Sequence, residues 1–271
     1  MTLLISHPAI PEIWDGISNT HPNPESFPIF PIMFVSIACG AISGFHATQS
    51  PMMAKCLKSE HHGRPAFYGA MITEGIVALI WAAAATCFFG ENGMDENNAA
   101  VIVDTITKTH LGTIGGILAL LGVIAAPIST GDTALRTARL IAADFLKLPQ
   151  KTIAKRLVLT VPIFAVTILL ILWSTSDKAG FDVVWRYFAW FNQTLSVFTL
   201  WAVTVYLVRE RKLFVVSLIP ALFMTAVSST YLFIAPECFH LSPSIAYPAG
   251  IACTALSLVW FALWMRRERK I

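Results

Sequence analysis

The sequence alternates between apolar runs and short polar segments that carry most of its charge. The apolar runs are about twenty residues long, enough for a helix to cross the ~30 Å hydrocarbon core of a bilayer. They predict seven membrane-spanning helices, over residues 29–46, 67–89, 113–130, 155–174, 184–208, 213–235 and 245–265. The expected fold class is therefore all-α, a polytopic protein with the lipid bilayer as its main partner.

The composition supports this expectation and excludes several classes of protein. The 271 residues are 56% hydrophobic and 13% charged, about half the charged fraction of a soluble domain. The net charge is +3, but no basic cluster interleaved with aromatic residues indicates nucleic-acid binding. Five cysteines without CxxC spacing indicate neither a disulfide framework nor a metal site. The sequence lacks a Walker loop and the GxSxG, HExxH and dinucleotide-binding motifs, which disfavours an enzyme and a bound cofactor.

The distribution of basic residues predicts the orientation of the spans. Sixteen of the 19 lysines and arginines follow the first, third, fifth and seventh spans, whereas Lys108, Lys178 and Arg186 lie in the other connections. The positive-inside rule then places those four segments, including the C-terminus, in the cytoplasm. Residues 1–27 become an external polar tail. Such a tail without a leader is unusual, so we expect a longer parent protein, a split gene or a partner that supplies earlier spans.

Two connections are more than turns, and they define the expected organisation. Residues 91–112 form an external loop with an apolar stretch, and residues 132–147 continue the third span as an amphipathic helix at the membrane surface. We expect residues 28–174 to form a transporter-like core of four spans. Residues 175–271 would add three spans and a basic cytoplasmic end.

Polar and helix-breaking residues crowd the end of the first predicted span. Gly40 and Gly44, four residues apart, permit close contact with a neighbouring helix. Ser43, His46 and Gln49 add hydrogen-bonding groups, and a histidine side chain can carry a proton or bind a carboxylate. This pattern indicates either a helix interrupted at membrane depth beside a wet cavity, or a helix that ends at Gly44 with His46 at the interface.

Three polar residues lie inside other predicted spans. Glu74 is about 10 Å deep in the second span at 1.5 Å per residue, where an ionisable group is costly and marks a candidate pathway. It is interpreted as a proton acceptor or ion-site carboxylate, or alternatively as a partner of a basic group. Asn192 and Gln193 in the fifth span either hold helices together or contact substrate.

The end of the third span offers a candidate cation site. It combines helix breakers with hydroxyl and carboxylate groups: Pro127, Ser129, Thr130, Gly131 and Asp132. Proline and glycine weaken a helix, and the freed carbonyls beside hydroxyls form a hard-oxygen set suited to a small cation. The alternative is that Asp132 and Arg136, four residues apart, form a structural ion pair.

Three separated blocks of the sequence resemble the carbon starvation protein A family. They are residues 37–51 (IACGAISGFHATQSP), 64–75 (RPAFYGAMITEG) and 127–145 (PISTGDTALRTARLIAADF). The resemblance covers about residues 27–160 and implies an inner-membrane transporter of peptides or, in some members, pyruvate. It also implies the fold of the amino acid–polyamine–organocation superfamily, a five-plus-five inverted repeat. The seven spans would resemble helices six to twelve of that fold, and the first repeat has no counterpart in this sequence.

The resemblance and the polar residues together give a functional hypothesis. The chain would be the C-terminal part of a secondary active transporter for peptides or small carboxylates, used in the response to nutrient starvation. The expected substrate-binding residues are Ser43, Gly44, Phe45, His46 and Gln49. The expected residues for a coupling ion, a proton or Na⁺, are Glu74, Ser129, Thr130 and Asp132. The alternatives are pyruvate uptake by proton symport, and a truncated, non-transporting subunit or gene remnant.

Overall fold

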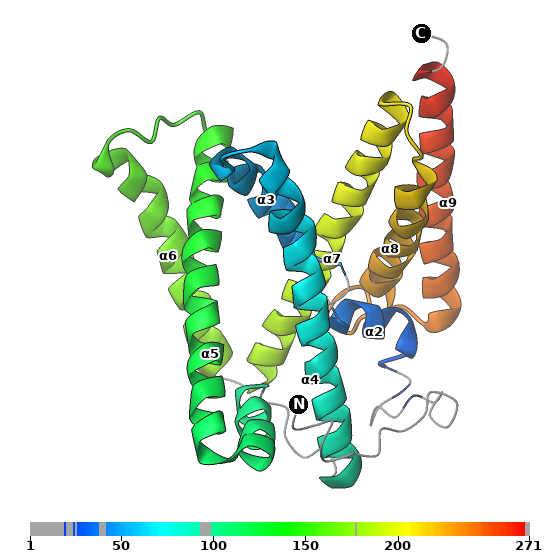
Figure 1. Ribbon diagram of the computed structural model, residues 1–271. Helices are drawn as coiled ribbons and strands as arrows, with labels where there is room; N and C mark the ends of the chain where they lie inside the picture. Colours follow the sequence, from blue (N-terminus) through cyan, green and yellow to red (C-terminus); the bar gives the residue numbers. More distant parts are fainter. Residues whose placement is uncertain are drawn as a thin grey trace. The chain divides into compact units, whose positions relative to one another are not determined.

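The computed structural model of the chain describes residues 19, 24, 26–37, 42–92, 99–176 and 178–268, and within them the regular structure is helical. The elements in chain order are α2 (Ile29–Ile37), α3 (Gly44–Cys56), the 3-10 turn η3 (Glu60–His62), the π-helical stretch η4 (Arg64–Gly69), α4 (Ala70–Asn92), α5 (Ala99–Phe145), α6 (Ile153–Ser176), α7 (Lys178–Arg209), α8 (Val215–Ile234) and α9 (Pro243–Glu268). Figure 1 shows them coloured along the chain. Most of the predicted external tail 1–27, and Gly40, lie outside the described residues.

The predicted all-α, polytopic class is confirmed. Among the described residues, six helical segments are long and apolar enough to cross a membrane: α4 together with the short helical turns before it, α5, α6, α7, α8 and α9. The remaining predicted span, residues 29–46, is not one helix. Its residues are divided between α2 and α3, which are 9 and 13 residues long.

Gly112 separates two parts of α5. Its backbone has φ 69° and ψ −172°, so the helical geometry is interrupted there. Glycine adopts a positive φ without the steric penalty that a Cβ atom brings. The predicted span therefore does begin at residue 113, but the predicted loop 91–112 is helical from Ala99 onward. The helix continues through the predicted segment 132–147 as far as Phe145, whereas its place at the membrane surface stays a prediction.

The chain divides into two compact units, one containing residues 58–169 and the other residues 19–57 and 170–271. This division differs from the predicted parts 28–174 and 175–271. The reason is that α2 and α3 pack on helices far along the chain, with α3 against α7 and α2 against both α7 and α8.

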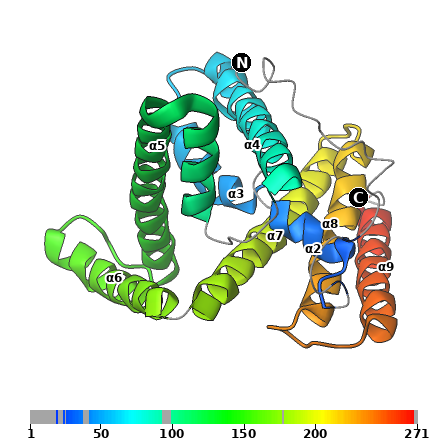
Figure 2. The same ribbon diagram turned by 90° about the horizontal axis from the view of Figure 1, so that it is seen from below.

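In the second unit, α8 packs on both α7 and α9, as Figures 1 and 2 show. Hydroxyl groups join α7 to α8: Thr194 and Ser228 are 2.8 Å apart, and Thr204 donates to Ser217 at 2.9 Å. Lipid tails are as apolar as leucine, so helices in a bilayer gain little from burying apolar surface against each other. Hydrogen bonds and close packing take over part of that role.

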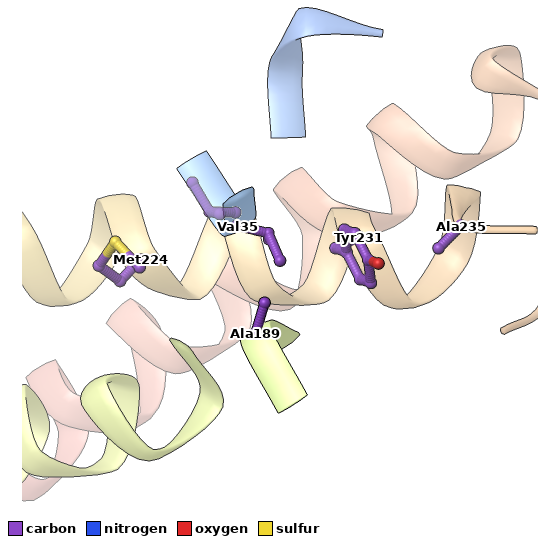
Figure 3. Close-up of a cluster of buried hydrophobic side chains, with 6 residues drawn as sticks. Val35, Ala189, Met224, Tyr231 and Ala235 are labelled. Carbon is purple, nitrogen blue, oxygen red and sulfur yellow. The ribbon is translucent and has the colours of Figure 1, made fainter. Parts of the chain in front are cut away.

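A buried apolar cluster fixes α2 in this unit. Val35 of α2, Ala189 of α7 and Met224 of α8 are each at most 5% exposed and belong to one cluster, which Figure 3 shows. Tyr231 and Ala235 extend it along α8 and just beyond its end. The first half of the interrupted span is therefore held by packing on two neighbouring helices.

Candidate functional site

The interruption between α2 and α3 is the feature around which a site can be built. α2 ends at Ile37 and α3 begins at Gly44, and Ser43 has extended backbone angles of φ −109° and ψ 115°. The helix is therefore interrupted at Ile42 and Ser43 among the described residues, whereas the predicted membrane depth and wet cavity stay predictions. The alternative, a helix that ends at Gly44, is wrong, because Gly44 is the first residue of a helix that continues to Cys56.

Side-chain hydroxyls support the backbone of α3 before the proline within it. Thr48 donates to the carbonyl oxygen of Phe45 at 2.7 Å, and Ser50 donates to that of His46. Pro51 has no N–H to donate to the preceding turn. Serine and threonine side chains commonly compensate for such breaks inside membrane helices.

Two consecutive carboxamide residues of α7 bind the two sides of the interruption. The backbone N–H of Phe45, in the first turn of α3, donates to Oδ1 of Asn192 at 2.9 Å. The side-chain amide of Gln193 donates to the carbonyl oxygen of Phe34, in the last turn of α2, at 3.1 Å. Both side chains are 0% exposed. Helix ends leave N–H and C=O groups without intrahelical partners, so Asn192 and Gln193 satisfy one such group on each side.

Gly44 lies directly against the backbone of α7. A Cβ atom built on Gly44 would be 2.1 Å from the carbonyl oxygen of Asn192 and 2.7 Å from the nitrogen of Ser196. The absence of a side chain therefore lets α3 start in contact with α7. The predicted close approach of a neighbouring helix at Gly44 is confirmed.

The five residues expected to bind substrate occupy different environments around this contact. Gly44 is buried, and Ser43, Phe45 and Gln49 are half-buried. The ring of Phe45 is 4.8 Å from that of Phe188 on α7, measured between centroids. His46 is exposed and lies in the first turn of α3, not in the extended segment. The structure thus gathers them at the start of one short helix; their binding role stays a prediction.

The residues expected to serve ion coupling lie in the other compact unit. Glu74 is half-buried on α4. Ser129, Thr130 and Asp132 lie on α5, which is helical from Thr113 to Phe145. Asp132 accepts a hydrogen bond from Arg136 at 2.8 Å, and both side chains are mostly exposed. The predicted ion pair is therefore present. Within the described residues, no three His, Cys, Asp or Glu side chains converge as a metal site requires.

Sequence reasoning missed a buried polar cluster around Glu237, in the connection between α8 and α9. The Glu237 side chain is 4% exposed, and its Oε1 accepts from the Arg186 guanidinium at 3.1 Å and from the Tyr231 hydroxyl. The Tyr187 hydroxyl donates to the Glu237 backbone carbonyl. Burial, and next the negative charge of Glu237, raise the pKa of the adjacent Cys238 thiol. The sequence feature that could have pointed to this cluster is the charge of Arg186. This arginine is one of three basic residues outside the predicted cytoplasmic segments.

Comparisons with known proteins connect the chain to one family and to relatives of different lengths. The family described as carbon starvation protein CstA matches residues 17–116 and 92–231. An uncharacterized protein of Haemophilus influenzae is 43% identical over 130 residues, which are 48% of this chain and 89% of that protein. No solved structure matches.

Several relatives have functional names. The protein named peptide transporter CstA of Campylobacter jejuni is 47% identical over 53 residues, 19% of this chain and 8% of that transporter. The protein named pyruvate/proton symporter BtsT of Escherichia coli is 46% identical over 59 residues, 21% of this chain and 8% of that symporter. The chain thus matches less than a tenth of the length of either named transporter.

Proposed function

Because the chain belongs to the carbon starvation protein CstA family, we propose that it forms part of a secondary active transporter in the cell inner membrane. Its substrates would be peptides or small carboxylates, taken up during nutrient starvation. The observation that carries the proposal is the interruption between α2 and α3, whose two sides are bound by Asn192 and Gln193. In secondary transporters, discontinuous helices of this kind line the substrate site.

The chemistry of the interruption suits an anionic substrate group. The N-terminus of α3 carries the positive end of a helix dipole, and its first N–H groups point away from the helix. A substrate carboxylate would bind there, beside the backbone of Ser43 and Gly44. His46, exposed in the first turn, would add a positive charge or exchange a proton. Phe45 and Gln49 would contact the remainder of the substrate. Peptides and pyruvate both present a carboxylate, so both fit this arrangement.

Coupling of substrate uptake to an ion would use ionisable and hydroxyl groups of the compact unit that contains residues 58–169. Glu74, half-buried in a span, would take up and release a proton. Ser129, Thr130 and Asp132 would hold a coupling ion or form part of a cytoplasmic gate. Since the E. coli relative is named a pyruvate/proton symporter, pyruvate uptake by proton symport is the second candidate function.

A third candidate is a subunit that transports only together with a partner. The H. influenzae relative is covered over 89% of its own length, so this relative is hardly longer than the matched segment. Another H. influenzae protein, an uncharacterized membrane protein, is 56% identical over 62 residues that make up 17% of its length. A separate chain that supplies further spans would complete the site in this case. A gene remnant without activity is the remaining alternative.

Uptake measurements on the reconstituted protein test the proposal. The tagged full chain would be purified from its own cells with associated membrane proteins retained, and placed in vesicles with an imposed pH gradient. We expect accumulation of a labelled dipeptide or labelled pyruvate, abolished by a protonophore. The same chain stripped of associated proteins distinguishes a self-sufficient transporter from a subunit. No uptake by either preparation contradicts the transport proposal.

A double variant tests the site residues. His46→Ala with Glu74→Gln should lower the initial uptake rate by about tenfold or more, the loss expected when a proton-transfer group is removed. The matched control is His62→Ala with Glu60→Gln, because these residues have the same chemistry but lie exposed in η3. Equal rates in the two double variants would remove His46 and Glu74 from the proposed site.

A further inference from the structure

Helices α7, α8 and α9 enclose an aromatic groove of about 490 Å³. Its aromatic lining residues are Phe198, Trp201, Trp260, Phe261 and Trp264. Phe198 and Trp260 are 69% and 77% exposed, so the groove opens at the surface of the helix bundle. Along α7 it extends from Val197 to Val205, about 12 Å at 1.5 Å per residue. The groove begins at Val197, directly after Ser196, whose backbone nitrogen lies against Gly44 at the start of α3.

The groove accepts hydrocarbon rather than a polar substrate. Thr225 and Ser257 are the hydroxyl-bearing residues that line it. The Thr225 hydroxyl donates to the carbonyl of Ala221 at 2.6 Å and accepts the Trp201 indole N–H at 3.0 Å. The Ser257 hydroxyl donates to the carbonyl of Cys253 at 2.9 Å. Since both hydroxyls are already engaged, a peptide or a carboxylate would lose its hydration there without replacement hydrogen bonds.

One end of the groove meets a cluster of positive charge. The Arg209 guanidinium lies 5.8 Å from the ring centroid of Trp264, a groove residue, and donates to Glu268 at 2.9 Å. Arg266 and Arg267 are exposed on the last turn of α9. Residues 209–212 and 266–268 together carry five basic and two acidic side chains. The groove residue Trp264 therefore lies beside Arg209 and two residues before Arg266, at an end of the bundle where the sequence has an excess of positive charge.

We propose that this groove binds an anionic phospholipid, with an acyl chain along the aromatic residues and the phosphate at the basic cluster. Guanidinium groups bind phosphate oxygens through paired, charge-assisted hydrogen bonds. Basic residues near a membrane surface attract anionic lipids. Tryptophan suits the boundary between acyl chains and headgroups because its ring is apolar and its N–H is polar. Lipid binding at this groove does not depend on transport.

Quenching of tryptophan fluorescence by brominated lipids tests this proposal on the full chain. Vesicles would contain brominated phosphatidylglycerol or brominated phosphatidylcholine at equal mole fractions. We expect half-maximal quenching at an about fivefold lower fraction of the anionic lipid, the preference that a net contribution of one basic residue near the surface gives. Trp201→Phe, Trp260→Phe and Trp264→Phe together should remove most of this preferential quenching while leaving the part due to the tryptophans outside the groove.

Charge variants locate the headgroup. Arg266→Gln with Arg267→Gln should shift the half-point for phosphatidylglycerol to that for phosphatidylcholine. Lys151→Gln with Lys155→Gln, which removes two charges from the other compact unit, should leave the preference unchanged. Equal half-points for both lipids in the unaltered chain would overturn the proposal. The proposal would also be overturned if neither lipid quenched Trp264 and the protein had the mass of a dimer. A second copy of the chain would then occupy the groove.

Discussion

Gly44 has no room for a side chain on its α7 side. Its added Cβ would lie 2.1 Å from a backbone oxygen and 2.5 Å from Cβ of Leu195, and neither atom can rotate away. We expect Gly44→Ala to push α3 from α7 and to lower the unfolding free energy by about 1–3 kcal/mol, as overpacking does. A lower midpoint of thermal unfolding in detergent would show this.

The control for this change is Gly122→Ala. Gly122 lies in α5, and a Cβ there meets nothing within 4 Å. Alanine is the better helix former, so the midpoint should stay the same or rise. Equal losses in both variants would contradict the packing explanation.

The Asn192 side chain accepts a hydrogen bond from the backbone N–H of Phe45, at the start of α3. Asn192→Leu removes the oxygen that accepts the Phe45 N–H and leaves this donor without that partner, at a cost of about 1–3 kcal/mol. We expect faster hydrogen exchange at Phe45 and unchanged exchange in α9. Gln193→Leu keeps the Asn192 bond and should affect Phe45 less. Identical exchange at Phe45 in the two variants would show that Asn192 is not its specific acceptor.

The sequence indicated polar residues at 192 and 193 but not their partners. They bind backbone atoms 147 and 159 positions earlier in the chain. Periodicity shows which face of a helix is polar, but not which residue lies opposite it. The Glu237 cluster was missed for the same reason, because Arg186 lies 51 positions before its partner.

The pH at which the Cys238 thiol reacts with an alkylating reagent measures the effect of the neighbouring Glu237 carboxylate. Burial and the neighbouring carboxylate raise the pKa of its thiol, and only the thiolate reacts with alkylating reagents. In a variant that keeps Cys238 as the single cysteine, the alkylation rate should therefore reach half its maximum above the pH typical of thiols, about 8.5. Glu237→Gln should move this midpoint to lower pH, because a negative charge is lost. An unchanged midpoint would show that the carboxylate has no such effect.

Helix boundaries were predictable where hydrophobic length decides them. The predicted spans 155–174, 213–235 and 245–265 correspond to α6, α8 and α9 within three residues at each end. The predicted span 29–46 failed in a different way. Hydropathy averages over side chains and does not detect a change in backbone angles, so an apolar segment that contains an interruption still reads as one helix.

The contact between α7 and α8 depends on hydroxyl groups that hydropathy also does not detect. Thr204 and Ser217 are 0% and 7% exposed and are joined at 2.9 Å. Thr204→Val keeps the shape and removes the bond, so we expect a loss of about 0.6–1.7 kcal/mol in unfolding free energy. Thr167→Val is the control, because its hydroxyl donates to Ile163 of its own helix. Equal changes in unfolding free energy would argue against an interhelical contribution.

At the scale of the whole molecule, the two ends of α7 carry different ion pairs. Arg209 pairs with Glu268 at one end, and Arg186 pairs with Glu237 at the other. The excess of basic residues lies at the end with Arg209, which the positive-inside rule assigns to the cytoplasm. Counting back from Arg209 through the candidate spans α7, α6, α5 and α4, and forward through α8, then fixes the sides of the other connections. Cys56 would then be cytoplasmic and Ser242 external.

Labelling of single cysteines with a membrane-impermeant maleimide tests that orientation. One variant keeps Cys56 as its only cysteine, and the other carries Ser242→Cys as its only cysteine; both positions are exposed. We expect Ser242→Cys to react in intact spheroplasts and Cys56 to react only after permeabilisation, because the five candidate spans α4 to α8 between them place the two positions on opposite sides. Labelling both variants after solubilisation controls for reactivity. Reaction of both positions in intact spheroplasts would contradict five single crossings between them, and reaction of Cys56 alone would reverse the orientation.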